Sequence, residues 1–106
     1  MVSAFLVTEA PPDAFFCFTD SMAIGTLSAL WAAGIRVPDD VSVAGFDDIA
    51  DGQFATPPLT TVSFDKRYFA EQTLARLVAR MSDASAPVTR VTVPHAIVSR
   101  ASAIRR

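Results

Sequence analysis

Carboxylate side chains follow two apolar runs of the sequence, and they are the residues best suited to chemistry. Asp47 and Asp48 come shortly after the apolar run 41–45, and Asp20 comes shortly after the run 14–18. Such carboxylates could accept hydrogen bonds from the hydroxyls of a sugar, or work as a general acid and base. Because no second catalytic element accompanies them, the sequence predicts a binding protein and not an enzyme.

A local role is the alternative for each of these carboxylates. Aspartate is common in turns and at helix starts, where its side chain accepts hydrogen bonds from backbone N–H groups. In that interpretation Asp20 or its neighbour Thr19 caps a helix, and Asp48 caps the following turn. Asp47 then has no local role, which makes it the strongest candidate for contact with a ligand.

His95 and Cys17 are the other side chains that could act as a base, a nucleophile or a metal ligand. His95 is the only histidine, and no Cys or Glu lies at metal-ligand spacing from it, so we expect no metal. Cys17 lies among phenylalanines, without a positive charge to stabilise a thiolate, so we expect a packing role. The four glycines are scattered and form no phosphate-binding loop, so we expect no nucleotide cofactor.

A strand, a helix and a second strand are expected to position the acidic groups. The apolar runs 14–18 and 41–45 have the length and composition of buried strands. Between them, residues 21–33 show the apolar spacing of a helix. A β-α-β unit of this kind has parallel strands, and ligands of open α/β sheets bind beyond the carboxyl ends of such strands. We therefore expect Asp20 and Asp47 to line one edge of a sheet.

The residues that follow are expected to extend the sheet and to add a second helix. Residues 45–56 have the composition of a loop with at most one helical turn, and residues 59–64 that of a strand. The second helix is expected to begin at Asp65. Its apolar stripe consists of Phe69, Leu74, Leu77, Val78 and Met81.

The two ends of the chain give weaker patterns. Residues 89–93 and 96–98 are candidates for two short strands. Residues 99–106 are expected to form a polar, basic tail. Residues 2–8 fit either the end of a helix or a strand.

The composition limits the classes of function open to the chain. A length of 106 residues fits one small domain. Hydrophobic residues make up 51% of the chain and the mean hydropathy is +0.35, a surplus that predicts contact between apolar surface and a partner. The net charge of -2 argues against a nucleic-acid-binding face. Without a membrane-length apolar stretch or a basic signal-peptide start, the chain is expected in the cytoplasm.

Three ordered blocks of the sequence resemble the lactose-repressor and galactose-repressor (LacI/GalR) family of bacterial transcription regulators. They are residues 13–25, 34–48 and 56–62, and residues 97–102 are similar to the family's ending. The likeness extends over residues 12–102. It implies an α/β, periplasmic-binding-protein-like fold with a Rossmann-like parallel sheet flanked by helices. In such regulators two subdomains close over a small effector, usually a sugar or a purine.

The resemblance implies that residues 1–106 are the carboxyl-terminal portion of an effector-binding domain, and that the DNA-binding region is absent from this chain. Residues 12–58 would form the core of the carboxyl-terminal subdomain. Residues 59–93 would form a crossover strand, helix and strand that normally pack on the amino-terminal subdomain, and residues 94–106 the return and tail. The role of residues 1–11 is left open.

The resemblance also implies which residues bind the effector. Asp47 matches the acidic residue that hydrogen-bonds the effector, and Thr19 takes the place of an asparagine that faces the cleft. Phe64 falls where the chain crosses between subdomains and where a glutamine is frequent. Because Thr19 and Phe64 change the polarity of cleft positions, the identity of the effector stays open. The implied ligand-binding residues are Asp47, Thr19, Asp20, Phe46 and Phe64.

Dimerisation is implied as well, chiefly through the carboxyl-terminal subdomain, and it would account for the surplus of apolar residues. The implied interface residues are Met22, Ile24, Ser28, Gln53 and Phe54. For Ile24 and Phe54, packing in the core is an equal alternative. The apolar stripe of the second helix would need a cover here, and exchange of that helix between identical chains would supply one.

The implied function is the sensing of a small molecule by a cytoplasmic transcription regulator. We expect a homodimer or a domain-swapped oligomer, without a cofactor, a membrane partner or direct contact between this chain and DNA. Effector binding would shift the balance between two closure states. Two alternatives stay open: a solute-binding protein with the same fold, and a truncated fragment that only self-associates.

Overall fold

The structure is a computed structural model that describes residues 10–104, and the chain forms two compact units. The first unit comprises Met1–Ser63 and Ala96–Arg106, and the second comprises Phe64–His95. The chain enters the second unit at the end of the third strand and leaves it at the start of the fourth. The helix end or strand expected at residues 2–8 lies outside the described residues.

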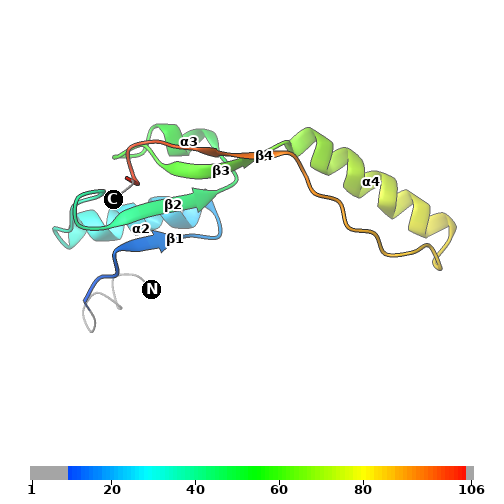
Figure 1. Cartoon of the computed structure of the whole chain (residues 1–106), viewed down its shortest axis with the longest axis horizontal. Coiled ribbons are helices and arrows are strands. Elements are labelled where there is room, and N and C mark those ends of the chain that lie inside the picture. The colour runs from blue at the N-terminus through cyan, green and yellow to red at the C-terminus, as the bar shows by residue number, and fades with distance from the viewer. Residues whose placement is uncertain (1–9, 105–106) are drawn as a thin grey trace. The chain divides into compact units, whose positions relative to one another are not determined.

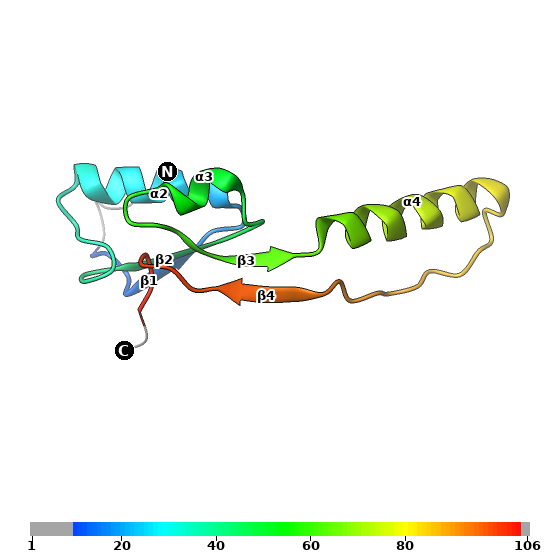
Figure 2. The same ribbon diagram turned by 90° about the horizontal axis from the view of Figure 1, so that it is seen from above.

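A four-stranded sheet with the order β1-β2-β3-β4 is the framework that carries the candidate site (Figure 1). The strands are β1 (Ala14–Phe16), β2 (Ser42–Phe46), β3 (Thr60–Phe64) and β4 (His95–Val98). β1 and β2 pair in parallel, with Ala14 opposite Ser42, and β2 and β3 also pair in parallel, with Ala44 opposite Thr60. The expected parallel pairing is confirmed for β1, β2 and β3, whereas the arrow of β4 runs opposite to that of β3 (Figure 2).

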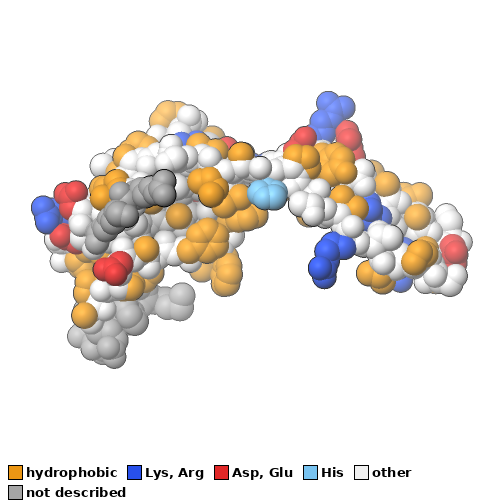
Figure 3. Space-filling view, viewed as in Figure 1, with side chains coloured by type: hydrophobic (Ala, Val, Ile, Leu, Met, Phe, Trp, Pro, Cys, Tyr) orange, Lys and Arg blue, Asp and Glu red, His pale blue; other side chains and the backbone are white. Residues whose placement is uncertain are grey.

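β1 is an edge strand, and the expectation of a buried strand over residues 14–18 is wrong in two respects. The strand ends at Phe16, whose side chain is 63% exposed, while Phe18 beyond it is 81% exposed. Hydrophobic side chains gather at the surface around the end of β1 (Figure 3). Cys17 is half-buried and lies after the strand, with its Sγ 3.5 Å from the Thr26 hydroxyl oxygen. Aromatic content indicates a strand but does not distinguish an edge strand from a central one.

Two helices of the first unit, α2 (Asp20–Ala32) and α3 (Ala50–Gln53), lie on the same face of the sheet (Figure 2). α2 begins after Thr19, whose hydroxyl accepts a hydrogen bond from the Met22 N–H at 3.2 Å. The helix is followed by Gly34, whose φ of 72° lies in the left-handed region that glycine adopts without strain. The predicted helix is therefore confirmed, and α3 is the single helical turn expected in the loop.

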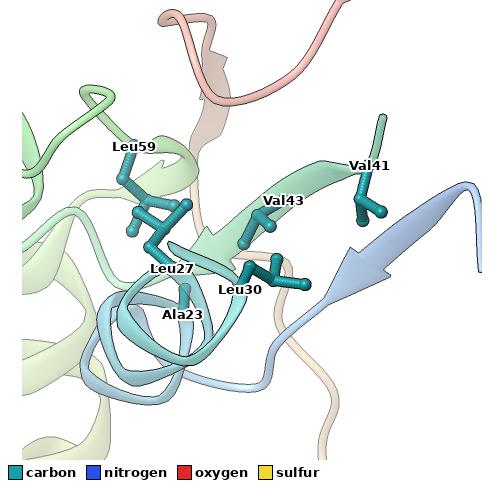
Figure 4. Packing of buried hydrophobic residues seen from close by; sticks show 6 residues of the cluster. All are labelled: Ala23, Leu27, Leu30, Val41, Val43 and Leu59. Carbon is teal, nitrogen blue, oxygen red and sulfur yellow. The ribbon is translucent and has the colours of Figure 1, made fainter. Parts of the chain in front are cut away.

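The hydrophobic core lies between α2 and the sheet (Figure 4). Its buried members are Ala23, Leu27 and Leu30 of α2, together with Val41, Val43 and Leu59. In β2, Val43 and Gly45 are buried while the residues between and beside them are half-buried. Since the helices cover one face, β2 alternates in burial and is not buried on both faces as its sequence indicated.

Residues 99–106 do not form the expected polar tail in their described part. Ser102 is fully buried, and its hydroxyl donates to the Val43 carbonyl at 2.6 Å and accepts from the Thr60 N–H at 2.8 Å. The Arg100 N–H donates to the Thr60 hydroxyl at 2.9 Å. Arg100 and Ser102, although distant in the sequence, therefore connect β2 and β3 by hydrogen bonds.

The second unit is built on α4 (Lys66–Ser82), and its predicted start is confirmed. The Asp65 carboxylate caps the helix by accepting a hydrogen bond from the Tyr68 N–H at 2.8 Å. Within the described residues, α4 buries none of its side chains. The whole of the predicted apolar stripe is accordingly exposed: Phe69, Leu74, Leu77, Val78 and Met81.

The segment that returns from α4 is held by arginine side chains of the helix. The Arg76 Nε donates to the Thr89 hydroxyl at 3.1 Å, and the Arg80 Nη1 donates to the Ala86 carbonyl at 2.9 Å. Residues 89–93 are not a strand, which corrects the prediction. Their alternating pattern has strand propensity, but in the second unit they line a hollow of about 200 Å³ with α4 and do not pair with a strand.

Candidate functional site

Asp47 and Asp48 lie at the carboxyl end of β2 in a backbone conformation that few aspartates adopt. Their φ angles are 109° and 50°, in the region that favours glycine. Such a conformation costs on the order of 1–3 kcal/mol and persists only where surrounding contacts impose it. The Asp47 N–H donates to the Val62 carbonyl of β3 at 3.0 Å, which fixes the start of this turn.

The two carboxylates of this turn have different surroundings. The Asp48 carboxylate forms an ion pair with the Arg100 guanidinium at 3.0 Å, and both side chains are about three-quarters buried. The Arg100 Nη1 also donates to the Leu59 carbonyl at 2.8 Å. The half-buried Asp47 side chain makes no hydrogen bond or ion pair within residues 10–104. Asp48 is therefore engaged within the chain, whereas the Asp47 carboxylate is available to a ligand.

Asp20 is fully buried, and its carboxylate joins three elements. It accepts hydrogen bonds from the Thr61 hydroxyl at 2.5 Å and from the Ile49 N–H at 2.9 Å. Thr19, one of the two residues expected to cap the helix, caps α2, and α3 begins after Ile49 without a side-chain cap. The cap expected of Asp20 is therefore wrong. Contact between Asp20 and a ligand stays a prediction.

The remaining predicted ligand-binding residues fall in both units. Thr19 and Phe46 are half-buried at the carboxyl ends of β1 and β2, the same edge of the sheet as Asp47. Phe64 begins the second unit, where its ring packs edge-on against Phe69 with centroids 5.8 Å apart. The structure therefore brings four of the five predicted residues to one edge of the first unit.

An apolar face on α2 and the α3 loop contains some of the predicted interface residues. A groove of about 380 Å³ is lined by Ile24, Leu27, Ser28, Trp31, Ala55 and Thr56. Phe54, which directly precedes Ala55, is 78% exposed, and Gln53 is also exposed. Met22 is 45% exposed on α2 but does not line the groove, since it lies two residues, or about 200° around the helix, from Ile24. Ile24 packs against the core, as one of its two interpretations predicted, whereas Phe54 does not.

Trp31, Arg100 and Thr61 are not among the site residues predicted from the sequence. Trp31 is 81% exposed in the apolar groove, and its spacing from Ile24 and Ser28 on one helical face could have revealed it. Arg100 and Thr61 have partners 52 and 41 residues away in the sequence, so no local pattern indicates them.

The described residues form neither a cluster of metal-ligating side chains nor a helix that could span a membrane. Within residues 10–104, no group of three or more His, Cys, Asp or Glu side chains is placed to hold a metal ion. None of the helices in that range is long and apolar enough to cross a membrane.

Comparison with known proteins identifies the family. Residues 2–103 match the family model of the periplasmic binding protein-like domain. The PurR transcriptional repressor of Vibrio parahaemolyticus is 45% identical over 75 residues, which are 71% of this chain and 22% of that protein. This relative is a transcriptional repressor, the class of protein that the resemblance implied.

Two solved structures share the fold. A lac repressor dimer bound to operator and the anti-inducer ONPF has a TM-score of 0.82 and 31% identity, covering 98% of this chain and 36% of that one. A complex of the transcriptional regulator CelR with cellobiose has a TM-score of 0.72 and 32% identity, covering 85% of this chain and 28% of that one. The chain therefore spans between 22% and 36% of the lengths of these proteins. It belongs to the periplasmic binding protein-like family and, within it, to the effector-binding domains of LacI/GalR-type transcription regulators.

Proposed function

We propose that this chain binds a small-molecule effector, a sugar or a purine, as part of a cytoplasmic transcription regulator. The observation that carries the proposal is the Asp47 carboxylate at the carboxyl end of β2. Asp47 is half-buried and its backbone is held at positive φ, while its carboxylate has no hydrogen-bond partner within the described residues. A carboxylate fixed in this way accepts hydrogen bonds from the hydroxyl groups of a sugar or the N–H groups of a purine.

A sugar is the better supported of the two effector classes. Neighbouring hydroxyls of one sugar ring can donate to both oxygens of the Asp47 carboxylate at once. Thr19 adds a second polar group and Phe46 an apolar ring at the same edge of the sheet, the combination that small-ligand sites use. The structural relative bound to cellobiose supports the same class.

The effector acts by changing the balance between two closure states of the regulator. It shifts that balance only to the extent that it binds one closure state more tightly than the other. Contacts by Asp47 therefore contribute to regulation to the extent that they differ in strength between the two states. DNA contact is made by another part of the regulator, since this chain carries a net charge of -2.

The apolar face on α2 and the α3 loop is the proposed dimer interface, formed between two copies of this chain. Its exposed aromatic side chains, Trp31 and Phe54, are of residue types that are enriched at protein–protein interfaces. The lac repressor relative is a dimer, which supports the same assembly. An exchange of α4 between copies would in addition cover its exposed apolar stripe.

Thermal unfolding with candidate effectors tests the binding proposal. The chain is heated with cellobiose, D-galactose, D-ribose or hypoxanthine, each at several concentrations. An effector at 100 times its dissociation constant stabilises the folded state by about 2.7 kcal/mol, which raises the midpoint by a measurable amount. Asp47→Ala should abolish this rise, whereas Asp13→Ala, at an exposed aspartate before β1, should keep it.

Sedimentation velocity tests the dimer proposal. Phe54→Lys should shift the chain from dimer to monomer, because it buries a charge in the apolar interface. Phe18→Lys is the matched control, since Phe18 is a phenylalanine of similar exposure outside the groove. Equal dimer fractions in the two variants would refute the assignment of the interface.

The same experiments separate the alternatives. A chain that forms dimers but is stabilised by none of the four compounds would be a fragment that only self-associates. A chain that binds a sugar but stays monomeric would favour a solute-binding protein of the same fold.

A further inference from the structure

The turn that presents Asp47 is held by side chains from two other elements. The Asp48 N–H donates to the Thr61 hydroxyl oxygen at 3.4 Å, and the same hydroxyl donates to the Asp20 carboxylate at 2.5 Å. The other oxygen of Asp20 accepts from the Ile49 N–H at 2.9 Å. Consecutive backbone N–H groups after Asp47 are therefore bound, directly or through one hydroxyl, to the same carboxylate.

This arrangement is buried and closely packed. Asp20 is 0% exposed and Thr61 is 1% exposed, so water does not compete for their hydrogen bonds. Gly45 leaves the space that the Asp20 carboxylate occupies, because a Cβ on Gly45 would overlap its Oδ1. A carboxylate placed at the start of α2 can reach the turn only because β2 carries glycine at this position.

We infer that Asp20 and Thr61 are positioning residues, which set effector affinity by holding the Asp47-Asp48 turn in its positive-φ conformation; for Asp20 this role replaces the direct ligand contact expected from the sequence, because both of its carboxylate oxygens accept hydrogen bonds within the chain. The inference rests on the proposed function, in which Asp47 binds the effector. Aspartates at φ angles of 109° and 50° relax toward ordinary backbone conformations when the contacts that impose them are removed. Relaxation of the turn moves the Asp47 carboxylate away from the geometry that the effector requires.

Thr61→Val is the variant that removes the hydroxyl and keeps the shape of the side chain. Thr61→Ser keeps the hydroxyl and should restore the behaviour of the wild type. Thr26→Val is the matched control, because Thr26 is also buried, at 4% exposure, but its hydroxyl contacts the Met22 carbonyl and the Cys17 Sγ and not the Asp47-Asp48 turn. Asp20→Asn is a second variant of the network, for use if Thr61→Val does not fold.

Backbone amide hydrogen exchange of the 106-residue chain, followed by NMR without effector, reports on the turn itself. In Thr61→Val the Asp48 and Ile49 amides should exchange faster than in the wild type by about 10-fold, while amides of α2 keep their protection. Thr61→Ser and Thr26→Val should leave the exchange at these two amides unchanged. Asp20→Asn should accelerate the Ile49 amide most.

Calorimetric titration with cellobiose, D-galactose and hypoxanthine reports on affinity, at a temperature where every variant is folded. Thr61→Val should weaken the dissociation constant of the bound compound by about 10-fold, a loss similar to that seen when a supporting hydrogen bond is removed from a metal ligand. Thr61→Ser should bind within about 2-fold of the wild type, and Thr26→Val should bind equally well.

The two readouts separate failure of the inference from failure of the proposed function. Faster exchange together with weaker binding supports the positioning role. Unchanged exchange in both Thr61→Val and Asp20→Asn would overturn it, and so would faster exchange with unchanged affinity. A wild-type chain that binds none of the three compounds would refute the proposed function and with it the effect on affinity, while the exchange rates would still decide whether these residues hold the turn.

Discussion

Replacement of Ser102 by alanine should destabilise the first unit strongly, although it removes a single oxygen atom. The Ser102 hydroxyl donates to the Val43 carbonyl at 2.6 Å and accepts from the Thr60 N–H at 2.8 Å, and all three residues are buried. Ser102→Ala leaves both backbone groups without this partner. An unsatisfied buried group costs about 1–3 kcal/mol, so we expect a loss of about 2–4 kcal/mol in the free energy of unfolding.

Urea unfolding followed by circular dichroism measures this loss. With the m-value of a small protein, the midpoint should fall by on the order of 1–3 M while the slope stays the same. Ser99→Ala is the matched control, since Ser99 is exposed three residues earlier and its replacement should change the free energy of unfolding by less than about 0.5 kcal/mol. If Ser102→Ala unfolds at the same urea concentration as Ser99→Ala, the Ser102 hydroxyl does not join β2 to β3.

Two further predictions concern glycine positions and an exposed carboxylate. Gly45→Ala should lower the free energy of unfolding in urea by about 1–3 kcal/mol, because a Cβ there overlaps the Asp20 carboxylate. Gly25→Ala, with open space around it, should raise that free energy by about 0.5–1 kcal/mol. Equal effects of the two substitutions would contradict the close packing at Gly45. Hydrogen bonds from the Ser85 hydroxyl and N–H lower the pKa of Asp83 in the folded chain. These hydrogen bonds therefore stabilise the folded state at pH values above the usual aspartate pKa, and this stabilisation is lost as the pH falls through the lowered pKa of Asp83. An NMR titration should show that Ser85→Ala raises the pKa of Asp83, and an unchanged pKa would exclude this cause.

The elements that position the site were predictable because their signals are local. α2 begins beside Thr19 and α4 begins beside Asp65, where a side-chain oxygen accepts from an N–H three residues ahead. The position of Asp47 at the carboxyl end of a parallel strand followed from the order of strand, helix and strand.

The contacts that hold the site were not predictable, because their partners are remote in the sequence. Asp20 seemed suited to a helix cap or a ligand contact, yet its hydrogen bonds reach residues 29 and 41 positions away. Ser102 lies in a basic stretch whose composition predicts a tail, and its hydrogen-bond partners are 42 and 59 positions away in the sequence. Short-range patterns likewise do not determine whether a strand has a neighbour, which is why residues 89–93 were expected as a strand.

Direct titration of the purified chain tests the central claim, that Asp47 binds a small-molecule effector. Cellobiose, D-galactose, D-ribose and hypoxanthine would be titrated by calorimetry into the wild type, Asp47→Ala and Asp13→Ala. At least one compound should bind the wild type and Asp13→Ala equally well, and Asp47→Ala should bind it at least about 10-fold more weakly, the effect of losing a charge-assisted hydrogen bond. Equal affinity in the wild type and Asp47→Ala would contradict the claim.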